Sequence, residues 1–529
     1  MKYLLLLFAV TAVAADIEFT NPGFEDGLAG KWKSSDGVRL STGKYTEGKQ
    51  GVSFDGNGAF LQYDFNIPRL SEGAKVTISF DIAATGDARW GIIKGNMRDG
   101  KWSSGRGTWN RKADPEFKHQ ELPLGTFLPP AEGTRLYFAL HKLGDTGTLF
   151  VDNFELQVDY PPPEVVPPLP PQNGKPLTIS PPRLPEVKNI DGILTLPKIF
   201  YGITGHEAQI YLKQLSSAPP DQHIKFKVDC PVGEVDGNVW RFRPNGTGRY
   251  PFIVTATDAN ENLLGKASAE ILISSPANTN DKNITFLAVG DSLTAGTDNW
   301  IHILHRNMTR QNPHFRMIGS HAGKGAPLTA GGPACEAYGG WTTLRYLSQW
   351  GENIYRFPTD RTRLMKKVDG KLEYDMKEYF DKYAGGQPPD VIVIFLGVND
   401  IAGAKDENRE EKARASAENL NRLVEGFRQA APESLIGLVL LPGANDREQA
   451  FRSNYRGAIT HSQYSANRMA HVRALLEKFG TDRNVSLIPL TGCLDTENGY
   501  PPGNALHPNA SGHAQIAAVM EAWLKGNAR

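Results

Sequence analysis

The sequence carries no net charge that would attract a charged polymer. Its 529 residues include 58 lysines and arginines and 58 aspartates and glutamates. Proteins that bind a polyanion or an anionic membrane through their overall field carry an excess of positive charge. The balance argues against a nucleic-acid partner.

Long apolar runs are also missing after the first residues, since no later stretch approaches the roughly 20 apolar residues that a spanning helix needs. Residues 1–15 combine Lys2, a short apolar run and small residues through Ala15. This pattern is typical of a secretory signal peptide, although a buried first strand would give a similar run. We expect a secreted protein, extracellular or periplasmic, with neither membrane insertion nor a cysteine near Ala15 for lipid attachment.

Cysteine is scarce, and the three residues present are Cys230, Cys335 and Cys493. An odd count leaves at least one thiol unpaired. Cys335 and Cys493 each precede a segment with candidate catalytic residues, so a disulfide between those two loops is one hypothesis for an exported chain. Three buried thiols are the alternative.

Local patterns divide the chain after the expected signal peptide. Residues 16–158 and 177–276 hold short alternating runs between turn residues, which predicts a β-sandwich in each. Residues 159–176 are rich in proline and should form an extended spacer. From 283 to 529 apolar strands alternate with helical stretches, as in a three-layer α/β domain with a parallel sheet. The predicted fold class is therefore multidomain, with two N-terminal β-sandwiches before an α/β domain.

Candidate reactive side chains follow strands of the α/β domain. Ser292 comes just after the apolar run 284–289, and Asn399 comes just after 391–396. In open parallel sheets, reactive groups gather beyond the carboxyl ends of strands. His507, in the loop before the last helical stretch, could accept the serine proton, and the Asn399 amide could donate to a developing oxyanion.

Each of these residues has an ordinary structural interpretation. Ser292 could cap a helix, Asn399 could form a turn, and His507 could be a loop histidine without a role. Their joint occurrence at strand ends of one α/β domain favours the catalytic interpretation.

These segments carry a family resemblance. Three of them resemble blocks one, three and five of the SGNH, or GDSL, hydrolases: Gly290-Asp291-Ser292-Leu293, Gly397-Val398-Asn399-Asp400 and His507-Pro508. Residues 336–342 resemble the second block, with Gly340 as the better match for its oxyanion glycine and Gly339 as the alternative. The resemblance covers about residues 283–528 and keeps the family's order of blocks.

The resemblance implies a two-step acyl transfer without a metal or organic cofactor. Ser292 would attack an ester carbonyl and His507 would take its proton. The backbone N–H groups of Ser292 and Gly340, with the Asn399 amide, would hold the oxyanion.

The chain departs from the family at Asn504, where the usual fifth block has an aspartate three residues before the histidine. An amide can orient imidazole but brings no negative charge. The enzyme could use Asn504 or a backbone carbonyl as orienter, it could borrow Asp495 or Glu497, or it could be inactive. We favour activity because Ser292, His507 and the oxyanion donors all remain.

The N-terminal segments 21–27 and 150–156, with Trp32, resemble carbohydrate-binding modules of the galactose-binding-like β-sandwich type. Residues 177–276 resemble the immunoglobulin-like domains that precede some secreted SGNH hydrolases, and their expected role is spacing. Tryptophans often stack on sugars, although they are more often core residues. The candidates for substrate contact are Trp341, Trp90, Trp102 and Trp109.

Together these features predict a serine esterase that removes acetyl groups from an acetylated polysaccharide or oligosaccharide. A lipase, arylesterase or thioesterase is the alternative, but the insertion 351–389 is charged and polar rather than an apolar lid. A non-catalytic glycan-binding protein, with Asn504 marking a decayed site, is a second alternative. The sequence predicts neither the polymer nor the oligomeric state.

Overall fold

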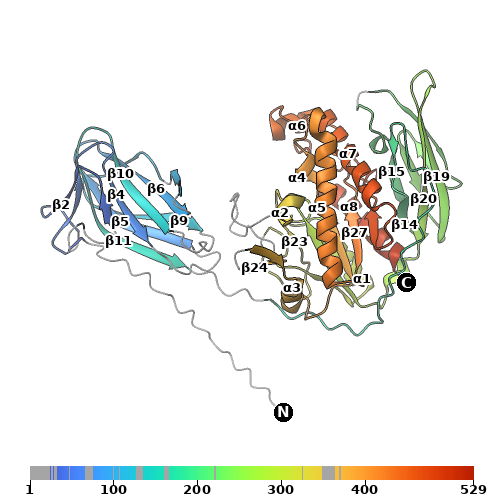
Figure 1. The fold of residues 1–529 in the computed structure, drawn as a ribbon, viewed down its shortest axis with the longest axis horizontal. Coiled ribbons are helices and arrows are strands. Elements are labelled where there is room, and N and C mark those ends of the chain that lie inside the picture. The colour runs from blue at the N-terminus through green and yellow to red at the C-terminus, as the bar shows by residue number, and fades with distance from the viewer. Residues whose placement is uncertain are drawn as a thin grey trace, which may run out of the picture. The chain divides into compact units, whose positions relative to one another are not determined.

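The computed structural model describes residues 24–25, 28, 32–46, 48–65, 75–98, 101–106, 108–126, 135–159, 166–219, 222–324, 326–347, 364–368 and 371–528. These residues form two compact units, one up to residue 159 and one from residue 166 (Figure 1). The expected signal peptide lies outside the described residues.

The first unit is a sandwich of two antiparallel sheets, as the alternating runs predicted. One sheet has the order β1 (Trp32–Ser34), β4 (Phe60–Phe65), β10 (Arg135–Leu143), β6 (Arg89–Arg98) and β7 (Lys101–Arg106), with β8 (Arg111–Lys112) paired to β6. The other has the order β2 (Val38–Ser41), β3 (Gly51–Phe54), β11 (Leu149–Asp159), β5 (Lys75–Ala84) and β9 (Lys118–Thr126). Aromatic rings fill the space between the sheets, including Phe24, Trp32, Tyr63, Phe138 and Phe154.

The second unit begins with another β domain, built from two larger sheets and a short hairpin. One larger sheet has the order β14 (Ile199–Ile203), β20 (Leu263–Ser274), β19 (Gly248–Thr257) and β16 (Lys225–Asp229). The other has the order β15 (Ala208–Tyr211), β18 (Val239–Phe242) and β17 (Glu234–Asp236). In the hairpin, β12 (Ile190–Asp191) pairs with β13 (Leu194–Thr195). Trp240 and Phe252 pack edge to face in the core between the sheets. A short 3-10 helix, η1 (Leu212–Leu215), directly follows β15.

An α/β domain completes this unit around a parallel sheet. Its strands run in the order β22 (Phe315–Ile318), β21 (Ile284–Gly290), β26 (Val391–Phe395), β27 (Leu435–Val439), β28 (Val485–Ile488), and β23 (Glu336–Ala337) pairs with the end of β21. Alternate residues of β21 enter two separate cores: Phe286 and Ala288 join one, and Leu287 and Val289 join the other. This two-sided burial explains why the strands read as continuous apolar runs.

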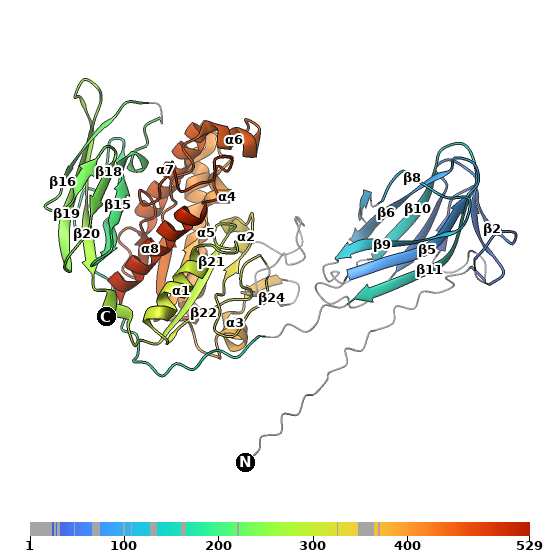
Figure 2. The ribbon, with the colours of Figure 1, turned by 180° about the vertical axis from the view of Figure 1, so that it is seen from behind.

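Helices cover both faces of the sheet, which confirms the predicted three layers. One layer contains α2 (Thr343–Leu347), α3 (Met376–Tyr383), α5 (Arg409–Ala430) and α7 (His461–Phe479), and the other contains α1 (Trp300–Gln311), α6 (Glu448–Tyr455) and α8 (Ala510–Asn527). Figure 1 shows the face with α5, and Figure 2 shows the opposite face with α1 and α8. The short α4 (Val398–Ile401) follows β26. Within the described residues, no helix combines the length and apolar character needed to cross a bilayer.

The hypothesis of a Cys335–Cys493 disulfide is wrong, because both residues are free thiols. Cys335 is fully buried in one core of the α/β domain, with its sulfur 3.7 Å from Nδ1 of His321. Cys493 instead packs against the core of the second β domain. The two sulfurs therefore belong to different cores.

Candidate functional site

Ser292 lies in a tight turn at the end of β21. The backbone N–H groups of Thr294 and Ala295 donate to the carbonyl oxygen of Asp291, at 3.0 and 2.8 Å. The Leu293 N–H donates to Oδ1 of the same aspartate at 3.0 Å. Asn299, not Ser292, caps the following helix α1, so capping does not account for the serine.

His507 contacts Ser292 across 215 positions of sequence, with 2.9 Å between Nε2 and the serine Oγ. Its other ring nitrogen, Nδ1, lies 3.3 Å from Oδ1 of Asn504. The backbone N–H groups of Leu506 and His507 also point at this amide atom, at 3.2 and 2.9 Å. Because two N–H donors converge on it, the atom is the amide oxygen, which can only accept.

This oxygen fixes the tautomer of the imidazole. Nδ1 must carry the hydrogen to contact Asn504, so Nε2 presents its lone pair to the hydroxyl of Ser292. His507 is exposed overall, yet partial enclosure of its ring, together with the nearby charge of Lys324, lowers its pKa. The imidazole is therefore a neutral base over a wider pH range than a free histidine.

Asp495, another proposed orienter, is engaged elsewhere. Oδ1 of Asp495 accepts the backbone N–H groups of Glu497 and Asn498, both at 2.9 Å, and so closes its own turn. Of the predicted candidates, the structure places Asn504 beside His507.

Asn399 lies at the start of α4, beyond the end of β26. Its amide nitrogen donates to the carbonyl oxygen of Trp341 at 3.0 Å and lies 3.3 Å from Oδ2 of Asp291. The next residue, Asp400, accepts the backbone N–H of Thr343 at 3.0 and 3.1 Å. The segment around Asn399, which resembles the third block, therefore contacts the segment around Trp341, which resembles the second.

Residues 338–341 form a turn in which the Trp341 N–H donates to the Tyr338 carbonyl at 3.3 Å. Gly340 occupies its third position with φ of +76°, a conformation that favours glycine. A Cβ added to Gly339 would lie 3.9 Å from Cβ of Ser292, whereas one added to Gly340 would meet nothing within 4 Å. Both glycines therefore belong to the loop beside the serine, and Gly339 is the closer in this respect.

Asp291 is fully buried between these elements. Burial, followed by repulsion from Asp400, raises its pKa to about 7. Its two oxygens contact the Leu293 N–H and the Asn399 amide. The carboxyl group thus connects the serine turn to the predicted oxyanion donor.

Two of the predicted sugar contacts are wrong because their rings are buried. Trp90 is 2% exposed in the core of the first unit, where it packs edge to face on Phe80. Trp341 is 3% exposed and packs on Tyr346. Trp102 is in β7, but its side chain lies outside the described part of the chain.

Trp109 is partly exposed on the outer face of a sheet in the first unit. A Cβ on Gly91 would meet its ring at 2.5 Å, so the indole covers this glycine. Gly91 is opposite His141, which is opposite Phe60, on three neighbouring strands. His141 has ring contacts with both Trp109 and Phe60, at 5.8 and 5.5 Å between centroids. The three rings form a row that we call the aromatic row.

Sequence reasoning missed several contributing residues. Asn445 is fully buried and donates to the carbonyl oxygens of Pro501 and Asn504, both at 2.9 Å. No motif marks it, since its role depends on contacts more than 50 positions away. The aromatic row was also missed, although the alternation along each strand would have revealed it once the strand register was known.

No group of three histidine, cysteine or acidic side chains that could hold a metal ion occurs among the described residues.

Comparison with known proteins gives a family match for the α/β domain. Residues 288–515 match the GDSL-like Lipase/Acylhydrolase family, which confirms the resemblance of this part of the chain. No curated protein matches the chain.

Several solved structures are similar to parts of the chain. A carbohydrate esterase family 3 protein from Talaromyces cellulolyticus is 15% identical over 46% of this chain and 96% of its own, with a TM-score of 0.31. A family 3 carbohydrate esterase from Clostridium thermocellum is 16% identical over 45% and 94%, with a TM-score of 0.28. The CBM22-1 xylan-binding domain from Paenibacillus barcinonensis is 13% identical over 26% and 93%, with a TM-score of 0.23.

Proposed function

We propose that the protein is a secreted serine esterase that removes acyl groups, above all O-acetyl groups, from a polysaccharide or oligosaccharide. The observation that carries the proposal is the 2.9 Å contact between Nε2 of His507 and Oγ of Ser292. The amide oxygen of Asn504 sets the imidazole in the tautomer that a general base needs. A histidine with a purely structural role would need neither this tautomer nor a contact with the hydroxyl of a partly exposed serine.

The proposed reaction has two steps. Oγ of Ser292 attacks the ester carbonyl while Nε2 of His507 takes the hydroxyl proton, and a tetrahedral intermediate forms. Its collapse breaks the bond to the sugar oxygen, which receives the proton from His507, and leaves an acyl-serine. Water then attacks the acyl group and gives a proton to His507. The acyl–Oγ bond breaks as His507 returns this proton to Oγ of Ser292, and the carboxylic acid is released.

The oxyanion would be held by the backbone N–H groups of Ser292 and of Gly340 or Gly339, together with the amide of Asn399. In the resting structure the Asn399 amide contacts Trp341 O and, at the longer distance of 3.3 Å, Asp291 Oδ2. We infer that the hydrogen near Asp291 is the one that turns to the oxyanion. An oxyanion donor of this kind contributes about 3 kcal/mol to transition-state stabilisation in another hydrolase.

The preference for a carbohydrate ester rests on the first unit. Its aromatic row places an indole, an imidazole and a phenyl ring in line on one outer sheet face. Flat apolar rings with polar neighbours are suited to stacking on sugar rings. The first unit would then retain the polymer while the α/β domain removes its acyl groups.

The test is release of acetate from p-nitrophenyl acetate and from a panel of acetylated polysaccharides by the purified chain. Ser292→Ala should abolish release from every substrate, whereas Ser453→Ala, at an exposed serine of α6, should not change it. Faster hydrolysis of long-chain than of acetyl esters would favour the lipase or thioesterase alternative. Release that persists in Ser292→Ala would overturn the serine mechanism, and no release by the unmodified chain would favour the glycan-binding alternative.

A further inference from the structure

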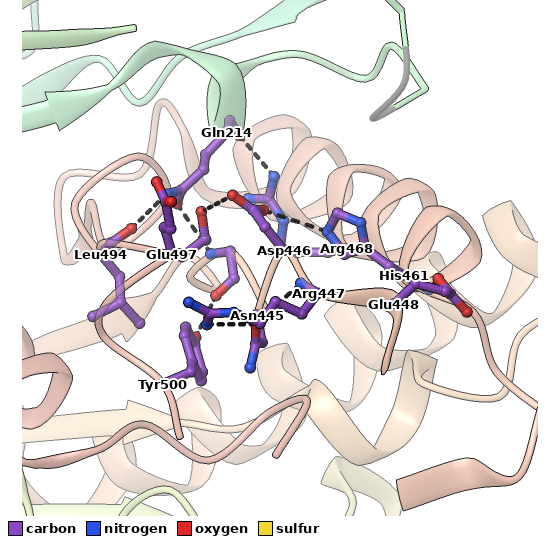
Figure 3. A network of polar contacts seen from close by, with 12 residues as sticks. Gln214, Asn445, Asp446, Arg447, Glu448, His461, Arg468, Leu494, Glu497 and Tyr500 are labelled. Carbon is purple, nitrogen blue, oxygen red and sulfur yellow. Dashed lines mark hydrogen bonds and ion pairs between the residues drawn. The ribbon is translucent and has the colours of Figure 1, made fainter. Parts of the chain in front are cut away.

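The second β domain inserts one side chain into the α/β domain. Gln214, in η1, is only 7% exposed although it belongs to a surface connection of its own domain. Its amide oxygen accepts the Gly443 N–H at 3.3 Å, and its amide nitrogen donates to the Leu494 carbonyl. Figure 3 shows this side chain reaching from the β domain into the loops below it.

The α/β domain is shaped to receive this insertion. A Cβ on Gly443 would lie 2.6 Å from the Gln214 amide oxygen, and one on Gly492 would lie 2.7 Å from Leu215. The Tyr211 N–H donates to the Gly492 carbonyl at 2.7 Å. Two glycines therefore leave room for η1, which indicates a fixed contact rather than a loose spacer.

A buried cation also holds the insertion. Arg468 of α7 is 3% exposed and donates to the main-chain carbonyl of Gln214 at 2.7 Å. Its guanidinium also donates to Oγ1 of Thr491 at 2.8 Å. Burial lowers the pKa of Arg468 to about 10, so it remains charged at neutral pH and needs these oxygen acceptors.

The loop that receives Gln214 is in direct contact with the loop that carries His507. Asn445, two residues after Gly443, donates to the carbonyls of Pro501 and Asn504, and its own N–H donates to Ala505 O at 3.0 Å. The hydroxyl of Tyr500 donates to the Gly443 carbonyl. Asn504, held in this way, presents its side-chain oxygen to His507. A continuous series of contacts thus joins Gln214 to the imidazole.

We propose that Gln214 is a positioning residue for His507, acting through Gly443, Asn445 and Asn504. The second β domain then forms part of the esterase site instead of serving only as a spacer. This inference rests on the proposed function, because it assigns the positioned imidazole to the serine reaction.

Gln214→Met tests the proposal, because methionine keeps the length and bulk of the side chain but removes both amide contacts. We expect kcat for p-nitrophenyl acetate to fall about tenfold with KM nearly unchanged, since small errors in the placement of a catalytic group cost 10- to 100-fold. Gln222→Ala, at an exposed glutamine of the same domain, should leave kcat unchanged. If Gln214→Met has a lower melting temperature but the same kcat as the unmodified chain, the proposal is overturned.

A second readout does not depend on turnover. The pKa of His507 can be measured by NMR titration of its Cε1 proton, assigned with His507→Gln. Its ring is partly enclosed near His513 and Lys324, so a loosened loop should admit water and move the pKa upward toward 6.5 in Gln214→Met. An unchanged titration would contradict positioning whether or not the chain is active. A shifted titration in a chain without Ser292-dependent activity would contradict the proposed function alone.

A double-mutant cycle tests the route. Asn445→Asp keeps the shape of the side chain but removes the donor to Pro501 and Asn504. If both residues act along one series of contacts, the loss of kcat in the double variant is smaller than the product of the two single losses. A multiplicative loss would show that Gln214 does not act through Asn445.

Discussion

The amide oxygen of Asn504 accepts two backbone N–H groups and lies 3.3 Å from Nδ1 of His507. We propose that it orients the imidazole as an aspartate would, without the negative charge. In a serine protease the same exchange costs about 10⁴-fold, because the amide there leaves the imidazole in the wrong tautomer. Here the backbone donors fix the amide oxygen toward Nδ1, so the tautomer is correct and only the charge is missing.

Asn504→Asp should therefore raise activity. The carboxylate would accept the same three N–H groups and would stabilise the imidazolium that forms in the transition state. We expect kcat/KM for p-nitrophenyl acetate to rise about tenfold at pH 8, in keeping with a charge effect alone.

The pH profile provides the control for this variant. A carboxylate beside His507 raises its pKa, so the acid limb of kcat/KM should move to higher pH in Asn504→Asp. The unmodified chain, whose His507 pKa is lowered by burial, should keep its activity to below pH 6.5. Lower activity at every pH in Asn504→Asp would show that the amide, rather than a charge, is required at this position.

Asp291 should make the protein less stable as the pH rises. Its carboxyl group has a pKa of about 7 in the fold against 3.8 in the unfolded chain, so folding favours the protonated form. Stability is then lost as the pH rises from about 4 to 7, by up to ~4 kcal/mol for a shift of this size.

Asp291→Asn removes this titration and keeps an oxygen for the Leu293 N–H. In urea unfolding at pH 8 we expect its free energy of unfolding to exceed that of the unmodified chain by about 2–4 kcal/mol, and at pH 4.5 we expect a much smaller difference. A difference of the same size at both pH values would exclude Asp291 as the titrating group.

Gly397 directly precedes α4, the helix that carries Asn399. It has φ of +122°, and a Cβ there would be 2.6 Å from the ring of the buried His471. Gly397→Ala should cost about 2–4 kcal/mol of unfolding free energy through overpacking and backbone strain, and should lower kcat at least tenfold by moving the Asn399 amide.

Gly403→Ala is the matched control, because a Cβ at this glycine of the same segment would meet nothing within 4 Å. It should change neither the free energy of unfolding nor kcat measurably. Similar behaviour of the two variants would mean that the contact with His471 does not position Asn399.

The sequence predicted the parts of the molecule that depend on local pattern. The alternating runs correctly predicted the sandwich of the first unit, and the continuous apolar strands such as 284–289 correctly predicted the parallel sheet. Buried tryptophans and exposed ones look alike in sequence, so the hypothesis that Trp90 and Trp341 contact the substrate is wrong. Gln214 could not be found because its partners lie more than 200 positions away.

The aromatic row should contribute to binding of the polymer. Trp109→Ala should weaken retention of the full chain on an acetylated polysaccharide, since the indole provides the largest ring in the row. A loss of about tenfold in affinity, or ~1.4 kcal/mol, is expected in binding isotherms on the insoluble polymer. Hydrolysis of p-nitrophenyl acetate, which needs no polymer contact, should be unchanged. Tyr45→Ala, at a tyrosine 41% exposed elsewhere in the same unit, is the control and should bind normally. If Trp109→Ala binds as tightly as Tyr45→Ala at equal melting temperature, the row is not the sugar-binding surface, and the first unit must retain the polymer through another face.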